Sequence, residues 1–332
     1  MSEPELGTKA PESDAMEPSI ISSTDTPAQT GPTMGEHCVT DRPTPATARQ
    51  PSGALTKFGD IEVYVSKPGD YPNTPAKLLL LLTSGTGVHS LNNQIQADLL
   101  AAEGFVVIMP DQFGGDAAPN TKAISNEEPA SPSILEQFKL RAAETAKSFL
   151  VDMWLARQTP EKVLPILLKV IDVVRDEYAD AVAHGGGIYS VGYCFGGKYT
   201  TLLAGEGVDA VGAVGQAQAQ APQDEETRVV KKASGPLIKA GAVAHATLVT
   251  REDLKGVKVP LSFVCVENDP LFPDEILEEG KKQFATSNLE HEIKTYPGVP
   301  HGFAVYGDYD SPTIKQAQQT AFQQILSWIK SH

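Results

Sequence analysis

The sequence of 332 residues lacks any long hydrophobic run and has few cysteines. Its longest purely aliphatic run, Leu78 to Leu82, is far shorter than the roughly 20 apolar residues of a membrane-spanning helix. The first residues are acidic and have no apolar centre, so they do not match a secretory signal peptide. The three cysteines, Cys38, Cys194 and Cys265, are an odd number and do not fit a disulfide framework. These absences predict a cytoplasmic protein in a reducing compartment.

Basic charge is also scarce. The chain has 27 Lys and Arg against 42 Asp and Glu, which gives a formal net charge of −15. Nucleic acids and anionic membranes are bound through basic faces. The charge therefore argues against nucleic-acid and membrane partners, and it says nothing about the fold or the oligomeric state.

Phe, Trp and Tyr are absent from residues 1–54, which are rich in Pro, Ser, Thr, Ala and Glu. Such a segment cannot bury enough apolar surface to offset the entropy lost on ordering. We predict a disordered N-terminal arm over residues 1–54, followed by one α/β domain over residues 55–332. His37 and Cys38 lie in this arm, but two possible ligands without a second pair favour a solvated segment over a metal site.

Within the domain, apolar β-prone runs alternate with amphipathic segments. Continuous apolar runs such as Phe105 to Met109 are typical of strands that helices cover on both faces. The alternation predicts a mostly parallel sheet with helices on both faces. The predicted strands are 60–67, 78–83, 105–109, 188–191, 237–245, 261–266 and 290–296, and the predicted helices include 91–103, 198–204, 274–287 and 314–330.

The segment from Gly187 to Tyr199, GIYSVGYCFGGKY, has the pattern of a nucleophile elbow. A β-prone run leads through a glycine-rich turn into a helix, with Cys194 flanked by Gly192 and Gly196. Only glycine leaves room where the chain crowds itself in such a turn. A helix that starts directly after Cys194 favours its thiolate. The alternative is a small buried cysteine in a glycine-rich turn, because free cysteine is often part of the core.

Two further candidates follow strands in the order that α/β-hydrolases use, which is nucleophile, acid, histidine. Asp269 comes directly after the strand LSFVCV, and His301 follows the strand that ends at Tyr296. Loops at the carboxyl ends of parallel strands meet in one crevice. We therefore predict a triad of Cys194, Asp269 and His301, in which Asp269 orients the imidazole. Glu267 and Asp274 are rival acids, and Asp269 is preferred because it lies in the turn itself.

The oxyanion hole is predicted from the same geometry. The backbone N–H of Phe195 follows the nucleophile and supplies one donor. The N–H of Gly85, after the first buried strand, is the expected second donor. His245, at the end of its predicted strand, either lines the pocket or is a structural histidine. His89, in the loop beside Ser84 and Gly85, either contacts the substrate or starts the next helix.

A helical insertion precedes the nucleophile strand. Ser133 to Arg157 and Glu161 to Asp180 are predicted as two helices, and Pro132 and Pro160 suit their first turns. The pair either forms part of a lid over the site or an outer layer of the fold, and the sequence favours neither.

From about Leu55 onward the sequence resembles the dienelactone hydrolase family, specifically its fungal-type members. The resemblance rests on GYCFGG around Cys194, ENDPLFP around Asp269 and YPGVPHGFAV around His301. It implies the α/β-hydrolase fold and hydrolysis of an ester or lactone through an acyl-thiol intermediate. It also implies that no metal or organic cofactor takes part.

Two departures from the family pattern concern the pocket. The family type member has a carboxylate that contacts the resting cysteine, where this chain has Ser84. It also holds its substrate carboxylate with arginines, whereas the matching stretches here, PDQFGGD and HGFAVYG, contain none. A neutral or larger ester or lactone is thus at least as good a candidate as dienelactone, with Lys198 or Arg141 as possible substitutes for the arginines.

Two other functions stay open at this point. The departures at Ser84 and at the arginines allow a protein that keeps the fold for binding or regulation with little turnover. An exposed reactive thiol at Cys194 also allows a redox sensor, although Cys38 on the arm is a poor resolving partner.

Overall fold

The computed structural model describes residues 39–43, 50–119, 149–206, 208 and 235–332. All of them fall in the compact unit Pro32–His332. The predictions for Cys38, His37, residues 133–148 and Arg141 lie outside the described residues.

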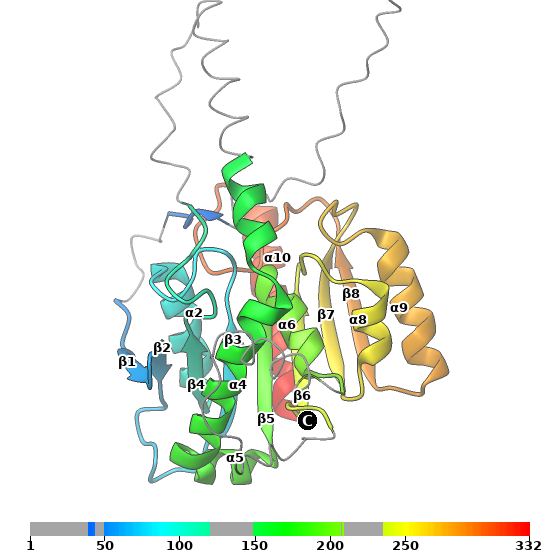
Figure 1. Ribbon diagram of the computed structural model, residues 1–332. Helices are drawn as coiled ribbons and strands as arrows, with labels where there is room; N and C mark the ends of the chain where they lie inside the picture. The colour runs from blue at the N-terminus through cyan, green and yellow to red at the C-terminus, as the bar shows by residue number, and fades with distance from the viewer. Residues whose placement is uncertain (1–38, 44–49, 120–148, 207, 209–234) are drawn as a thin grey trace, which may run out of the picture. The chain divides into compact units, whose positions relative to one another are not determined.

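The described residues contain one eight-stranded sheet with the order β1-β2-β4-β3-β5-β6-β7-β8 (Figure 1). Strands β4, β3, β5, β6, β7 and β8 run parallel, and β1 and β2 form an antiparallel edge. The predicted mostly parallel sheet is confirmed. The strands are β1 (Ala54–Phe58), β2 (Ile61–Ser66), β3 (Lys77–Leu82), β4 (Phe105–Pro110), β5 (Ile188–Tyr193), β6 (Ala240–Ala244), β7 (Leu261–Val266) and β8 (His291–Tyr296).

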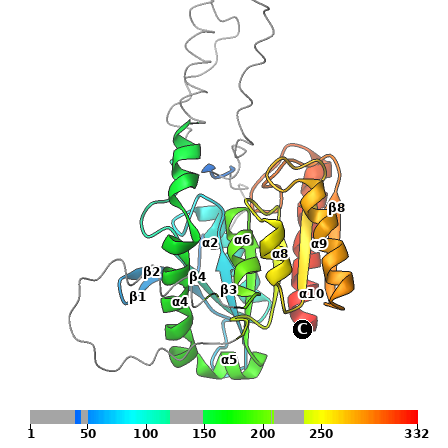
Figure 2. The same cartoon turned by 45° about the vertical axis from the view of Figure 1, so that its right-hand side comes forward.

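Helices cover both faces of this sheet, as predicted (Figure 2). Alternate residues of a strand point to opposite faces, and in β3 Leu80 joins one core cluster while Leu79 joins the other. Residues of α4, α6, α8 and α9 belong to the first cluster, and residues of α2 and α10 belong to the second. The helices are α2 (Leu91–Ala102), α4 (Pro160–Glu177), α5 (Ala179–Gly185), α6 (Phe195–Leu203), α8 (Arg251–Gly256), α9 (Asp274–Thr286) and α10 (Pro312–Ser331).

Three elements differ from the sequence-based expectation. Strand β1 is missing from the predicted set because most of its residues are exposed and give no apolar signal. The predicted helix Glu161–Asp180 is interrupted at Tyr178, where α4 ends and α5 begins. The predicted strand Leu237–His245 is shorter and covers Ala240–Ala244. Of the predicted helix Ser133–Arg157, residues 149–157 are described and helical.

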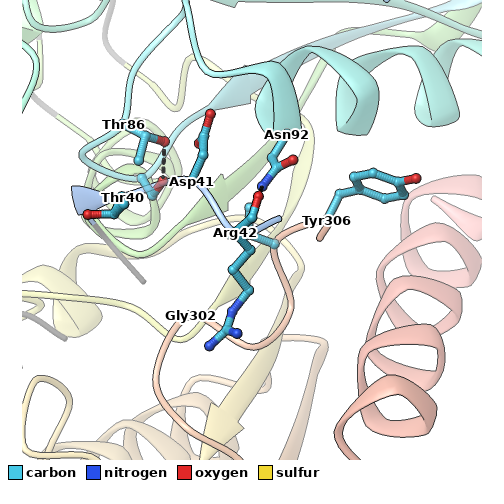
Figure 3. A pocket seen from close by; sticks show the side chains of 9 residues that line it. Thr40, Asp41, Arg42, Thr86, Asn92, Gly302 and Tyr306 are labelled. Atoms are coloured by element: carbon cyan, nitrogen blue, oxygen red, sulfur yellow. Dashed lines mark hydrogen bonds between the residues drawn. The ribbon is translucent and has the colours of Figure 1, made fainter. Parts of the chain in front are cut away.

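Residues 39–43 lie within the predicted arm, and in the structure they contact the domain (Figure 3). The Asp41 carboxylate accepts hydrogen bonds from Ser90 Oγ at 2.5 Å and from the Leu91 N–H at 3.2 Å, at the start of α2. The Arg42 guanidinium lies 3.6 Å from the centre of the Tyr309 ring. The N–H of Asp308 donates to the Pro43 carbonyl at 2.8 Å. This short segment therefore joins the start of α2 to the loop that follows β8.

We expect Asp41→Ala to lower the free energy of unfolding by about 1–2 kcal/mol, because a carboxylate that accepts from a helix N-terminus is worth roughly that much. Urea unfolding of the full chain measures the change. Asp70→Ala, in the exposed loop before β3, is the matched control and should leave the stability unchanged. Equal stability of the two variants would contradict a structural role for residues 39–43.

Candidate active site

The elbow at Cys194 forms as predicted, and its backbone is strained. β5 ends at Tyr193, α6 begins at Phe195, and Cys194 between them has φ 52° and ψ −114°. A Cβ on Gly196 would lie 2.2 Å from the Leu82 carbonyl oxygen, and a Cβ on Gly192 would lie 2.4 Å from that of Gly196. Both positions therefore require glycine. Strained conformations of this kind persist where the surrounding packing fixes them.

The chain around Cys194 is held from two sides. The Cys194 N–H donates to the Ala244 carbonyl of β6 at 3.0 Å, and the Gly196 N–H donates to the Thr83 carbonyl after β3 at 3.0 Å. Cys194 directly precedes the first helical residue, so the positive end of the α6 dipole favours negative charge on its sulfur. The side chain is fully buried.

The predicted acid and histidine form a close pair. His301 Nδ1 lies 2.6 Å from Asp269 Oδ2, and both side chains are buried. The N–H of Leu271 donates to the other carboxylate oxygen of Asp269 at 3.0 Å, which fixes its orientation. The rival acids Glu267 and Asp274 are exposed.

Burial alone would lower the pKa of His301. Hydrogen bonds to Asp269 and Cys194, together with the negative charges of both groups, outweigh burial and raise the pKa from 6.5 to about 9. The imidazole is therefore poised to carry a proton at neutral pH while it faces the thiol. The structure thus brings together Cys194, Asp269 and His301.

Thr247, which sequence reasoning did not single out, also contacts the thiol and the imidazole. Its hydroxyl oxygen lies 3.2 Å from Cys194 Sγ and 3.2 Å from His301 Nε2. It follows β6 in the chain and is fully buried. A single threonine in the run AHATLV carries no chemical pattern, so no signal in the sequence identifies it.

His245 is fully buried beside His301, and the centres of the two rings are 5.0 Å apart. Neither ring nitrogen of His245 has a hydrogen-bond partner among the described residues. Burial lowers its pKa, and the nearby Cys194 thiol opposes this only in part. His245 is therefore a neutral ring at the edge of the site, with no exposed surface.

The remaining predicted residues lie in the loop after β3. Ser84 is buried, and its hydroxyl pairs with that of Thr86 at 3.0 Å. It lines a cavity of about 10 Å³ together with Arg42, Thr86 and Gly302 (Figure 3). The side chain of His89 is 67% exposed and lies 2.8 Å from Glu62, outside this cavity.

The two amides predicted for the oxyanion hole make no hydrogen bond within the described part of the chain, since neither the Phe195 nor the Gly85 N–H donates there. The Gly85 carbonyl accepts from Ala118 at 2.8 Å. Phe195 itself packs against Phe113 and Trp154, with ring centres 5.4 and 5.5 Å away. Through Trp154, the described part of the predicted insertion contacts the residue that follows the nucleophile.

Residues 61–332 match the dienelactone hydrolase family. This chain belongs to the dienelactone hydrolase family. Among curated proteins, hydrolase tropI of Talaromyces stipitatus is 30% identical over 285 residues, covering 85% of this chain and 91% of that protein. The predicted family and the α/β-hydrolase fold are confirmed. The predicted function is confirmed as a hydrolase of this family, while the nucleophile and the substrate stay predictions.

Two solved structures share the fold. One is a Klebsiella pneumoniae protein named for dienelactone hydrolase, with a TM-score of 0.58 at 17% identity, covering 85% of this chain and 99% of the other. The second is an esterase of Thermogutta terrifontis with propionate bound, with a TM-score of 0.51 at 14% identity, covering 84% and 96%. At these identities the likeness shows the fold alone.

Across the described ranges, no helix is long and apolar enough to cross a membrane. The same ranges contain no group of three or more His, Cys, Asp or Glu side chains placed to bind a metal ion. The predicted location and the predicted absence of a cofactor stay predictions.

The raised pKa of His301 makes the stability depend on pH. A histidine whose pKa rises on folding stabilises the folded state below its unfolded pKa of about 6.5, and this stabilisation is lost as the pH rises toward 9. We expect the stability difference between the wild type and His301→Asn to shrink over this range. Urea unfolding at several pH values measures it, with His89→Asn as the control. A difference that stays constant with pH would contradict a charged Asp269–His301 pair.

Proposed function

We propose that this protein is a cysteine hydrolase that cleaves a carboxylic ester or lactone through an acyl-thiol intermediate. One observation carries the proposal: a buried Asp269–His301 pair faces the thiol of Cys194, which lies on a strained turn at the start of a helix. A thiolate at a helix N-terminus beside a protonated imidazole is the activated form of a cysteine nucleophile.

In the first half of the reaction, Cys194 Sγ attacks the carbonyl carbon of the substrate and a C–S bond forms. The carbonyl oxygen becomes an oxyanion, and the N–H groups of Phe195 and Gly85 would donate hydrogen bonds to it. When the intermediate collapses, the C–O bond of the ester breaks. The leaving alkoxide takes the proton from His301 Nε2. In a lactone, the alcohol formed in this step stays attached to the acyl group.

In the second half, His301 takes a proton from water, and the hydroxide attacks the acyl-thiol. The C–S bond breaks and releases the carboxylic acid and Cys194. Asp269 orients His301 throughout and stabilises its charged form. All of these steps use residues of this chain.

A neutral ester or lactone is the proposed substrate class. The stretch from the last residue of β4 onward, PDQFGGD, has no basic side chain, and its Asp111 carboxylate accepts hydrogen bonds from the Phe113 and Gly115 N–H groups. The stretch after His301, HGFAVYG, has no basic residue either. A substrate carboxylate would therefore meet no cation from these two stretches.

The test uses p-nitrophenyl acetate, a small ester that suits a buried thiol, with intact mass recorded during turnover. We expect wild type to gain one acetyl group at Cys194 and to release p-nitrophenol, and we expect Cys194→Ala to lose both. The rate should fall at least about 100-fold in the variant, because the covalent route is removed.

Cys265→Ala is the matched control. Cys265 is also buried, in β7, and burial raises the pKa of its thiol to about 12, so it is a poor nucleophile. This variant should keep wild-type turnover. Turnover that survives in Cys194→Ala would contradict the proposal. A stable adduct without turnover would instead favour the second hypothesis, a binding or regulatory protein of this fold.

A further inference from the structure

The loop that follows β6, residues 245–248, has a strained backbone at two residues that are not glycine. His245 has φ 36° and Leu248 has φ 60°, both in the left-handed region that favours glycine. Strain of this kind persists only where surrounding contacts fix it, and it is concentrated at functional sites. Thr247 lies between the two strained residues.

Backbone hydrogen bonds fix this loop on both sides of Thr247. The His245 N–H donates to the Val264 carbonyl of β7 at 2.7 Å. The Thr247 N–H donates to the Cys194 carbonyl at 3.1 Å. On the far side, Lys198 Nζ donates to the Leu248 carbonyl at 2.8 Å and pairs with Asp253 at 2.9 Å. The loop is therefore tied to the elbow itself.

The result of this anchoring is the position of one hydroxyl group. Thr247 Oγ1 lies 3.2 Å from both Cys194 Sγ and His301 Nε2, in a fully buried site. A hydroxyl has one donor and two acceptor sites. It can donate to a thiolate and accept from a protonated imidazole at the same time. Hydrogen bonds to charged groups are about twice as strong as neutral ones, so this arrangement favours the charged pair.

The neighbouring polar side chains do not offer the same contacts. The Ser84 hydroxyl is paired with Thr86. His245 also lies beside both groups, but its contact with His301 is between the two rings, whose centres are 5.0 Å apart, and it is not a hydrogen bond. Of these three polar side chains, Thr247 is the one whose hydroxyl lies within hydrogen-bond distance of both Cys194 Sγ and His301 Nε2.

We propose that Thr247 is a further catalytic residue, whose hydroxyl stabilises the Cys194 thiolate and the His301 imidazolium as a pair. This inference rests on the proposed function, because it concerns the same thiol. When the pair forms, the proton that leaves Sγ ends on Nε2, and the hydroxyl is unchanged. The hydroxyl then donates to sulfur and accepts from Nε2–H.

The test compares Thr247→Val, which replaces the hydroxyl by a methyl group of similar size, with Thr247→Ser, which keeps the hydroxyl. The readout is the rate of acetylation of Cys194 by p-nitrophenyl acetate as a function of pH. Besides the pair itself, the titratable groups around it are His245 on the same loop, Tyr193 on β5, Asp269 after β7, and Lys198 with Asp253 beside the loop. All of these titratable residues are the same in Thr247→Val and Thr247→Ser.

We expect acetylation of Thr247→Val at neutral pH to be at least about 10-fold slower than wild type, with the rise in rate displaced to higher pH. Thr247→Ser should stay within about 3-fold of wild type and keep its pH profile. A purely structural role would lower the rate without moving the profile. If Thr247→Val does not fold, Thr247→Ala removes the same hydroxyl without adding a methyl group, and the same comparison applies.

Equal rates and profiles in wild type and Thr247→Val would overturn the role of Thr247 and leave the proposed function intact. A wild-type Cys194 that is not acetylated at all would overturn the proposed function, and the role of Thr247 with it. Because the wild-type result separates these two cases, each failure is recognisable.

Discussion

The close approach of three backbone segments at the elbow is the constraint on which the site depends. The chain turns at Cys194 with a left-handed φ, and glycine is required at Gly192 and Gly196 because no Cβ fits beside Leu82 and the start of α6. Hydrogen bonds from Cys194 to β6 and from Gly196 to the loop after β3 lock this arrangement. These contacts therefore hold the elbow, the end of β6 and the loop after β3 in fixed positions relative to one another.

The geometry of the elbow also determines which groups surround the charges on Cys194 and His301. Cys194 faces the start of α6, and His301 faces both the thiol and Asp269 from the loop after β8. Burial of these groups would oppose charge, but each charged form meets a partner of opposite sign or a hydrogen-bond donor. In our proposals, the Thr247 hydroxyl completes this set, and the charged pair is the state from which the ester is attacked.

Much of the fold was predictable because strands buried on both faces give continuous apolar runs, as β3 and β7 do. Exposed β1 gives no such signal, and residues 39–43 depend on contacts with α2 and Tyr309 that composition cannot show. The elbow was predictable from its glycine-rich turn after a strand. The pairing of Asp269 with His301 was predictable because each residue follows a strand of a parallel sheet. Thr247 was not predictable, because 53 residues separate it from Cys194 and only the sheet order brings them together.

The charge state of Cys194 tests the central claim most directly, and the ultraviolet absorbance of the thiolate reports it. The arrangement around Cys194 predicts thiolate absorbance in the wild type at neutral pH. This signal should disappear in Cys194→Ala and persist in Cys265→Ala, and it should weaken in Asp269→Asn because the imidazolium loses its partner. A wild-type spectrum without thiolate at neutral pH, identical to that of Cys194→Ala, would contradict an ion pair at this site.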